Sequence, residues 1–163
     1  MKVNEKAAAR GGELFESGLF CAESVLKTVA EQARLESALV PGIATGLCGG
    51  MARTGGTCGA LTGGMLAIGM LRGRRSAEDS VEETYALVQK LSQEFETRFG
   101  GTNCTGLLGC DLGTTQGREQ FKQDNLGERC REFTAVAAGL VMELLDEAPE
   151  VVSTLSAPGD GEK

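Results

Sequence analysis

The chain has 163 residues, of which 41% are hydrophobic and 24% charged, with a formal net charge of −7. A chain of this size and composition can bury enough apolar surface for one domain. Its negative charge repels nucleic-acid phosphates and anionic membrane surfaces, so we expect neither nucleic acid nor membrane as a partner.

Histidine is absent from the sequence. Its absence excludes Ser-His-Asp and Cys-His nucleophilic catalysis and every His-liganded zinc site. The six cysteines therefore become the leading candidates for chemistry.

No targeting or spanning segment is predicted. The first 18 residues are polar and mixed in charge, unlike a signal peptide. The longest apolar run, residues 61–71, contains three glycines and falls short of the roughly 20 residues that span a bilayer. We expect a cytoplasmic protein.

Hydrophobic residues recur at helical spacing along most of the chain, and no segment alternates with the period of a strand. We interpret Ser76-x-x-Asp79 as the cap of a long helix that Gly100-Gly101 ends. The fold is therefore predicted to be all-α, a compact bundle of about five or six helices with a central glycine-rich helix. In chain order, the predicted helices cover residues 6–15, 20–34, 39–48, 57–71, 76–99 and 128–145. Residues 103–109 form a short segment, and the polar stretch 113–127 has room for one short helix around residues 118–123.

The domain organisation follows from the same pattern. Residues 1–147 form a single helical, cysteine-containing domain. Residues 148–163 lack periodicity, contain Pro149 and Pro158, and are predicted to be a flexible C-terminal tail.

Four glycines lie within the apolar helix of residues 57–71, and each costs up to about 1 kcal/mol relative to alanine. Small residues at this spacing let another helix, or a bound group, approach closely. We therefore predict that Gly59 and Gly63 approach a cofactor or a neighbouring helix. The glycine-rich loop before this helix lacks the Lys-Ser/Thr ending of a phosphate-binding loop. Arg53 within this loop could hold an anion, but we interpret it as a solvated side chain.

Four cysteines, Cys21, Cys58, Cys104 and Cys130, fall at or near the predicted starts of helices. The free amides and partial positive charge of a helix start lower the pKa of a cysteine. A thiolate attacks disulfides and captures soft metal ions. The other two, Cys48 and Cys110, are interpreted as secondary, as resolving partners, extra ligands or core residues.

The separations among the four cysteines are 37, 46 and 26 positions. Zinc ribbons and ferredoxins deliver their ligands in close pairs, so these thiols meet only through the tertiary fold. If they meet, two disulfides, a Cys-only zinc site and an iron–sulfur cluster all remain open. The alternative for each of the four cysteines is that it packs in the core as a small hydrophobic residue.

The segment Cys58-Gly59-Ala60-Leu61-Thr62-Gly63 resembles the C-G-A-x-x-G element of the bacterial and archaeal C-GCAxxG-C-C family of redox-active proteins. The isolated Cys21 before it, and Cys104 and Cys130 after it, follow the same order. The resemblance covers about residues 10–146 and departs at Phe20, where a polar capping residue is expected. It implies a helical fold and a thiol- or metal-based redox role for these four cysteines.

Three hypotheses follow. In the first, Cys58 is the principal thiolate of a thiol oxidoreductase or electron carrier, and Cys21, Cys104 and Cys130 exchange electrons with it and with a redox partner protein. In the second, the same four thiolates hold zinc or an iron–sulfur cluster. In the third, the chain is a non-catalytic helical interaction protein, and Gly59, Gly63 and Gly64 form a self-association seam of a homodimer.

Overall fold

The computed structural model describes residues 1–148, so the predicted tail lies, except for Ala148, outside the described residues. Within residues 1–148 the chain is all-helical, which confirms the predicted class, and it contains no strand. The helices are α1 (Val3–Glu16), α2 (Cys21–Gln32), α3 (Cys48–Arg53), α4 (Gly59–Arg72), α5 (Glu82–Phe99), α6 (Cys104–Leu108), α7 (Thr115–Gln123) and α8 (Gly127–Glu147), with a 3-10 helix, η1 (Gly42–Leu47), before α3.

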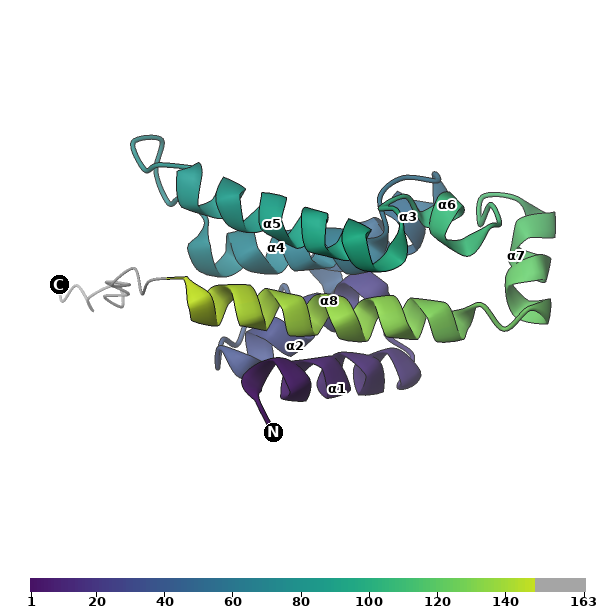
Figure 1. Ribbon diagram of the computed structural model, residues 1–163, viewed down its shortest axis with the longest axis horizontal. Coiled ribbons are helices and arrows are strands. Elements are labelled where there is room, and N and C mark those ends of the chain that lie inside the picture. The colour runs from purple at the N-terminus through teal and green to yellow at the C-terminus, as the bar shows by residue number, and fades with distance from the viewer. Residues whose placement is uncertain (149–163) are drawn as a thin grey trace, which may run out of the picture.

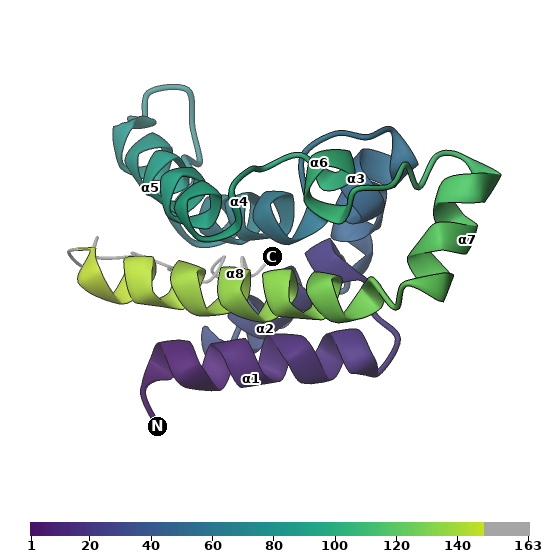
Figure 2. The same ribbon diagram turned by 45° about the vertical axis from the view of Figure 1, so that its right-hand side comes forward.

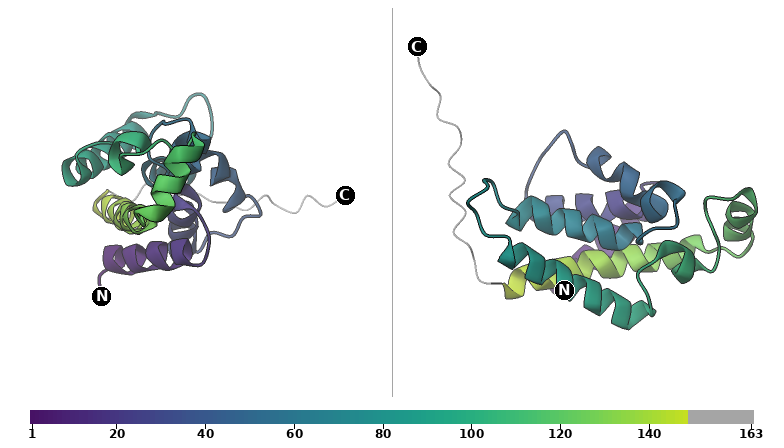
Figure 3. Two further views of the ribbon diagram at one scale, coloured as in Figure 1. Left: turned by 90° about the vertical axis from the view of Figure 1, so that its right-hand side faces the viewer. Right: turned by 90° about the horizontal axis from the view of Figure 1, so that it is seen from above.

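Helix α8 is the axis of the bundle (Figure 1). It contacts α1 and α2 on one side and α4 and α5 on the other, as Figures 1 and 2 show. The short helices α3, α6 and α7 gather at the end of the bundle where α8 begins (Figures 1 and 3). The molecule therefore has a packed helical body and a distinct end built from short elements.

The core of the body comes from apolar stripes at helical spacing. Phe95 and Leu91 of α5 are fully buried, as are Val141 of α8 and Ile68 of α4. The rings of Phe95 and Phe133 meet edge to face with their centroids 6.1 Å apart. Aromatic pairs in this arrangement add to the stabilisation that burial alone provides.

The glycines of α4 let it pack closely within its own chain. A Cβ on Gly63 would lie 2.7 Å from the Cα of Ala22, on α2. A Cβ on Gly64 would lie 2.9 Å from the Cδ2 of Leu91, on α5. Gly63 and Gly64 are buried against α2 and α5 of the same chain, so they do not form the predicted self-association seam.

Three local predictions need correction. The segment predicted as a helix over residues 39–48 is the 3-10 helix η1, which begins after Pro41. The long helix begins at Glu82, because the Asp79 carboxylate closes the preceding loop by accepting bonds from the N–H groups of Arg75 and Ser76. Residues 1–148 contain eight α-helices, more than the five or six predicted, because short helices form at the cysteine-bearing end.

No helix in residues 1–148 combines the length and the apolar character needed to cross a membrane.

Candidate functional site

A cavity of about 640 Å³ opens at the end of the bundle where α3, α6 and α7 meet the starts of α2, α4 and α8. Five cysteines line it, namely Cys21, Cys48, Cys58, Cys104 and Cys130. Tertiary structure thus brings together the four cysteines singled out in the sequence and adds Cys48. Gly59 also lines the cavity, whereas Gly63 packs away from it against α2.

Cys58 and Cys104 are brought together by an antiparallel bridge between Thr57 and Asn103. The Cys58 N–H donates to the Thr102 carbonyl at 2.7 Å, and the Cys104 N–H donates to the Gly56 carbonyl at 2.9 Å. Residues related in this diagonal way project from the same face of a pair of extended segments. The bridge therefore directs both thiols to the same side.

Asn103 holds this arrangement in place through both ends of its side-chain amide. Its Oδ1 accepts a bond from the N–H of Gly106 and so caps α6, and its Nδ2 donates to the carbonyl of Gly55. One side chain thus starts the helix that begins at Cys104 and ties that helix to the segment before Cys58.

Cys21 and Cys48 form a second close pair. A Cβ built on Gly59 would meet the Cys21 Sγ and lie 3.1 Å from the Cys48 Cα, so the two residues approach the same point. Interaction with the Cys21 thiol, followed by burial, raises the pKa of Cys48 far above its usual value. The Cys48 thiol also donates to the Ala44 carbonyl at 3.6 Å. Two buried cysteines that approach the same point are candidates for a disulfide, in which the sulfurs lie about 2.05 Å apart.

The entry of α2, which positions Cys21, depends on Glu23 rather than on Phe20. The Glu23 carboxylate accepts from the Phe20 N–H at 2.8 Å and from the Thr45 hydroxyl at 2.6 Å. The reaching-back carboxylate of a capping box thus starts this helix without a polar N-cap side chain.

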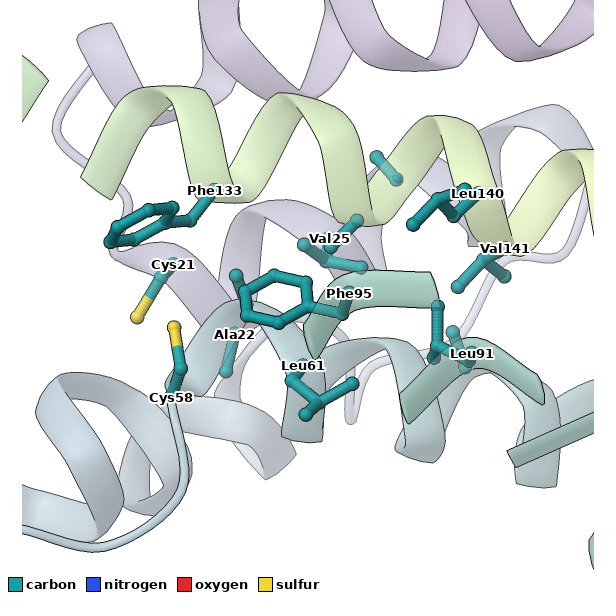
Figure 4. Packing of buried hydrophobic residues seen from close by; sticks show 14 of the residues in the cluster. Cys21, Ala22, Val25, Cys58, Leu61, Leu91, Phe95, Phe133, Leu140 and Val141 are labelled. Carbon is teal, nitrogen blue, oxygen red and sulfur yellow. The ribbon is translucent and has the colours of Figure 1, made fainter. Parts of the chain in front are cut away.

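Gly59 connects the two pairs. A Cβ at this position would collide with the Sγ of Cys21 and would lie 2.9 Å from the Leu47 carbonyl oxygen. The missing side chain therefore lets the Cys21 sulfur reach the start of α4, next to Cys58. Figure 4 shows the sulfurs of Cys21 and Cys58 pointing toward each other at the edge of the apolar core, near Phe133.

Helix α3 contains a left-handed turn. The φ angles of Gly49, Gly50, Met51, Ala52 and Arg53 all lie between +56° and +70°. A residue with a side chain loses about 1–2 kcal/mol in this conformation. Backbone strain of this kind is concentrated at functional sites, and here the strained turn, which follows Cys48, places Ala52 and Arg53 in the cavity wall.

The predicted lowering of the thiol pKa values is wrong for three of the four cysteines. Burial raises the pKa of Cys58 to about 11, although the amides of Ala60 and Leu61 at the start of α4 oppose the shift. Burial, with smaller effects from neighbouring cysteines, also raises the pKa of Cys130 to about 12. The pKa of Cys104 is raised by burial and by Cys110. Desolvation therefore outweighs the helix starts, and these resting thiols are protonated at neutral pH.

Cys48, which the sequence ranked as secondary, lines the cavity together with the four cysteines ranked first. The available signal was its setting, because Cys48-Gly49 repeats the cysteine–glycine step of Cys58-Gly59. Cys110 is buried but does not line the cavity, and burial followed by the charges of Asp124 and Asp111 raises its pKa.

Among residues 1–148, no three Cys, His, Asp or Glu side chains are grouped so that they could hold a metal ion.

Comparison with known families supports the redox class. Residues 19–144 match the family model described as "Putative redox-active protein (C_GCAxxG_C_C)". The chain belongs to this family. The matched span of the C-GCAxxG-C-C model contains all six cysteines. No curated protein and no solved structure shows a significant match to the chain.

Proposed function

We propose that this member of the C-GCAxxG-C-C family is a thiol redox protein that cycles between dithiol and disulfide forms at the cysteine-lined cavity. The observation that supports this function best is the close approach of Cys21 to Cys48 at Gly59, beside Cys58, in a wall formed by five cysteines. Packing of isolated cysteines as small hydrophobic residues requires neither the close approach of two cysteines nor an adjoining cavity.

The reaction that this arrangement supports is thiol–disulfide exchange. A cavity thiol loses its proton and attacks a sulfur of an external disulfide, forming a mixed disulfide and releasing the first thiolate, which takes up a proton. A second cavity thiol then attacks the protein sulfur of that mixed disulfide. Two electrons pass to the external disulfide, which leaves as two thiols, and the protein retains one disulfide.

Cys58 is the best placed thiol for the first attack. It lines the cavity at the start of α4, and the Ala60 and Leu61 amides stabilise its thiolate once that thiolate forms. Cys104, directed to the same side by the bridge, and Cys21, against Gly59, are the candidates for the second attack. A redox partner protein, or a small disulfide, would accept the electrons.

A second candidate function, binding of zinc or an iron–sulfur cluster, draws on the same five-cysteine wall. In the described arrangement the sulfurs would have to move together before three or four of them could share one ion. If they did, Cys21, Cys58, Cys104 and Cys130 would supply thiolate ligands from four different helical elements.

The test is to purify the protein without oxygen, measure bound metal and the visible spectrum, oxidise it mildly, alkylate the free thiols and identify disulfides by mass spectrometry. We expect Cys21–Cys48 and Cys58–Cys104 disulfides that a dithiol reductant reverses. A Cys110→Ser variant is the matched control, because this buried thiol lies outside the cavity, and it should form the same disulfides. Stoichiometric metal or a cluster spectrum would favour the second candidate, and thiols that all stay reduced would exclude thiol exchange.

A further inference from the structure

The cavity wall carries a charge opposite to that of the whole chain. The chain has 23 acidic and 16 basic residues. Yet three cationic side chains line the cavity, Arg53, Arg118 and Lys122, and none of the lining residues found within 1–148 is Asp or Glu. A concave surface with cations and no carboxylates attracts anions.

These three cations are not neutralised by the protein. In the part of the chain that the structure describes, the ion pairs involve Arg10, Arg72, Lys90 and Arg131, and none involves a cavity cation.

Arg118 is held in place by neutral partners. Its Nη1 donates to the Leu112 carbonyl at 2.9 Å, and its Nη2 donates to the Thr115 hydroxyl at 3.3 Å. These contacts orient the guanidinium without cancelling its charge. A guanidinium also carries more donors than these two bonds use, and it matches carboxylate, sulfonate and phosphate oxygens.

The cations lie on two elements. Arg118 and Lys122 are four residues apart on α7, so their side chains share one helix face, and Phe121 lies beside them in the cavity wall. Arg53 belongs to the left-handed turn, whose backbone packs against the loop after α6, because a Cβ on Gly113 would lie 2.8 Å from the Arg53 carbonyl oxygen.

The rest of the wall is apolar. Phe15, Phe20, Phe121 and Phe133 line the cavity together with three leucines. The volume of about 640 Å³ lies within the range typical of small-molecule sites, roughly 300–1,000 Å³. Sites of this size combine an apolar lining with a few polar groups that orient the ligand.

We propose that the cavity binds a low-molecular-weight organic anion with an aromatic or similarly flat apolar body. Arg118 and Lys122 hold its acidic group, with Arg53 as a further cation, and the phenylalanine side chains cover its apolar body. The cavity cysteines then lie within the same site. One part of this proposal rests on the proposed function. If the bound anion is itself a disulfide, that disulfide oxidises the protein dithiol to a disulfide and leaves as two thiols.

Binding is tested first without any redox step. The reduced protein is titrated with 8-anilinonaphthalene-1-sulfonate, an aromatic anion whose fluorescence rises in apolar sites. We expect saturable binding that weakens at least tenfold in an Arg118→Gln/Lys122→Gln variant and recovers in the charge-preserving Arg118→Lys/Lys122→Arg variant. Arg98→Gln, which removes an exposed cation on α5 that does not line the cavity, should bind as the unaltered protein does. Circular dichroism verifies that each variant is folded, and equal affinity in all variants would overturn the proposal.

A second measurement separates this inference from the proposed function. Cavity thiols are allowed to react with the anionic disulfide 5,5′-dithiobis(2-nitrobenzoate) and with the neutral 2,2′-dithiodipyridine. We expect the Arg118→Gln/Lys122→Gln variant to slow the anionic reaction at least fivefold and to leave the neutral reaction unchanged. Equal slowing of both reactions, or of neither, would contradict the anion site while leaving thiol exchange intact. Cation-dependent fluorescence with no reaction of any cavity thiol would support the anion site and contradict thiol exchange.

Discussion

The helical body and the cysteine-bearing end of this molecule both contain apolar residues and glycines, but they are packed differently. In the body, the long helices α4, α5 and α8 interlock so closely that Phe95, Leu91 and Ile68 are fully buried and glycines take the place of side chains. At the cysteine-bearing end, apolar residues surround an open cavity, and the backbone adopts a left-handed turn. The fully buried aromatic and aliphatic side chains lie mainly in the body, and five of the six cysteines lie at the cavity end.

The lengths of the elements explain this division. Helices of 14 to 21 residues present several turns of apolar surface to one another. The elements at the cavity end have 5 to 9 residues, and two of them, α6 and α7, are started by the side-chain caps Asn103 and Thr114. Short capped elements can surround a space that long helices would fill.

The largest expected contrast is between two phenylalanines. Phe95→Ala should lower the free energy of unfolding by about 3–5 kcal/mol, because it removes a fully buried ring from the body. Phe121→Ala, in the cavity wall, should lower it by less than Phe95→Ala does, because its ring is only partly buried. Urea denaturation of both reduced variants measures the difference. Similar losses would mean that the cavity end is part of the same cooperative core.

A second contrast lies within α4. Gly63→Ala should cost about 1–3 kcal/mol, since the new methyl group would meet the Ala22 backbone, which cannot move aside as a side chain can. Gly69→Ala, in the same helix, meets nothing within 4 Å and should stabilise the protein by up to about 1 kcal/mol. Thermal or urea unfolding of the two variants measures whether each substitution lowers or raises the free energy of unfolding. A stable Gly63→Ala protein would show that the approach of α2 to α4 is less tight than described.

The cavity thiols should make stability depend on alkaline pH. Burial raises the pKa of Cys58 from an ordinary value near 9 to about 11, so between these values the unfolded chain loses a proton that the folded chain keeps. This contribution is fully present below pH 9 and is lost as the pH rises toward 11, at up to about 1.4 kcal/mol per pH unit. Urea denaturation of the reduced protein from pH 8 to 11 should show that the free energy of unfolding falls less steeply with pH in Cys58→Ser than in the unaltered chain. An equal slope in both would place Cys58 in a more polar setting.

The smallest expected effect concerns the strained turn. Ala52→Gly should stabilise the protein by about 0.5–1 kcal/mol, because relief of the left-handed strain exceeds the extra freedom of glycine in the unfolded chain. Ala9→Gly, at an exposed position of the right-handed helix α1, should instead destabilise it by about 1 kcal/mol. Denaturant unfolding should therefore give changes in the free energy of unfolding of opposite sign for the two variants. A loss of stability in Ala52→Gly would contradict the left-handed assignment.

Much of the fold could be predicted from local patterns. The stripe containing Phe133, Ala137 and Leu140 belongs to α8, and Gly100-Gly101 ends α5 as predicted. Predictions failed where a residue type that caps helices can also close a loop. Asp79 has the chemistry of a helix cap, yet it closes a loop before Glu82, since the same carboxylate bonds serve both purposes.

The candidate site was less predictable than the fold. The start positions of Cys21, Cys58 and Cys104 on their helices agree with the structure, because capping and glycine signals are local. The pairing of Cys21 with Cys48 and the raised thiol pKa values depend on burial and on neighbours distant in the sequence.

The sequence by itself therefore determined the all-α class, the choice of cysteines as the candidate reactive groups in a chain without histidine, and the family to which the Cys58–Gly63 segment points. Only the tertiary structure decided that five thiols share one cavity, that Cys48 belongs among them, and that three uncompensated cations line the same wall. The physical reason is that helix formation follows from residues a few positions apart. The proximity of the thiols, desolvation and charge compensation follow from segments that meet only when α2, α3, α4, α6, α7 and α8 have packed together.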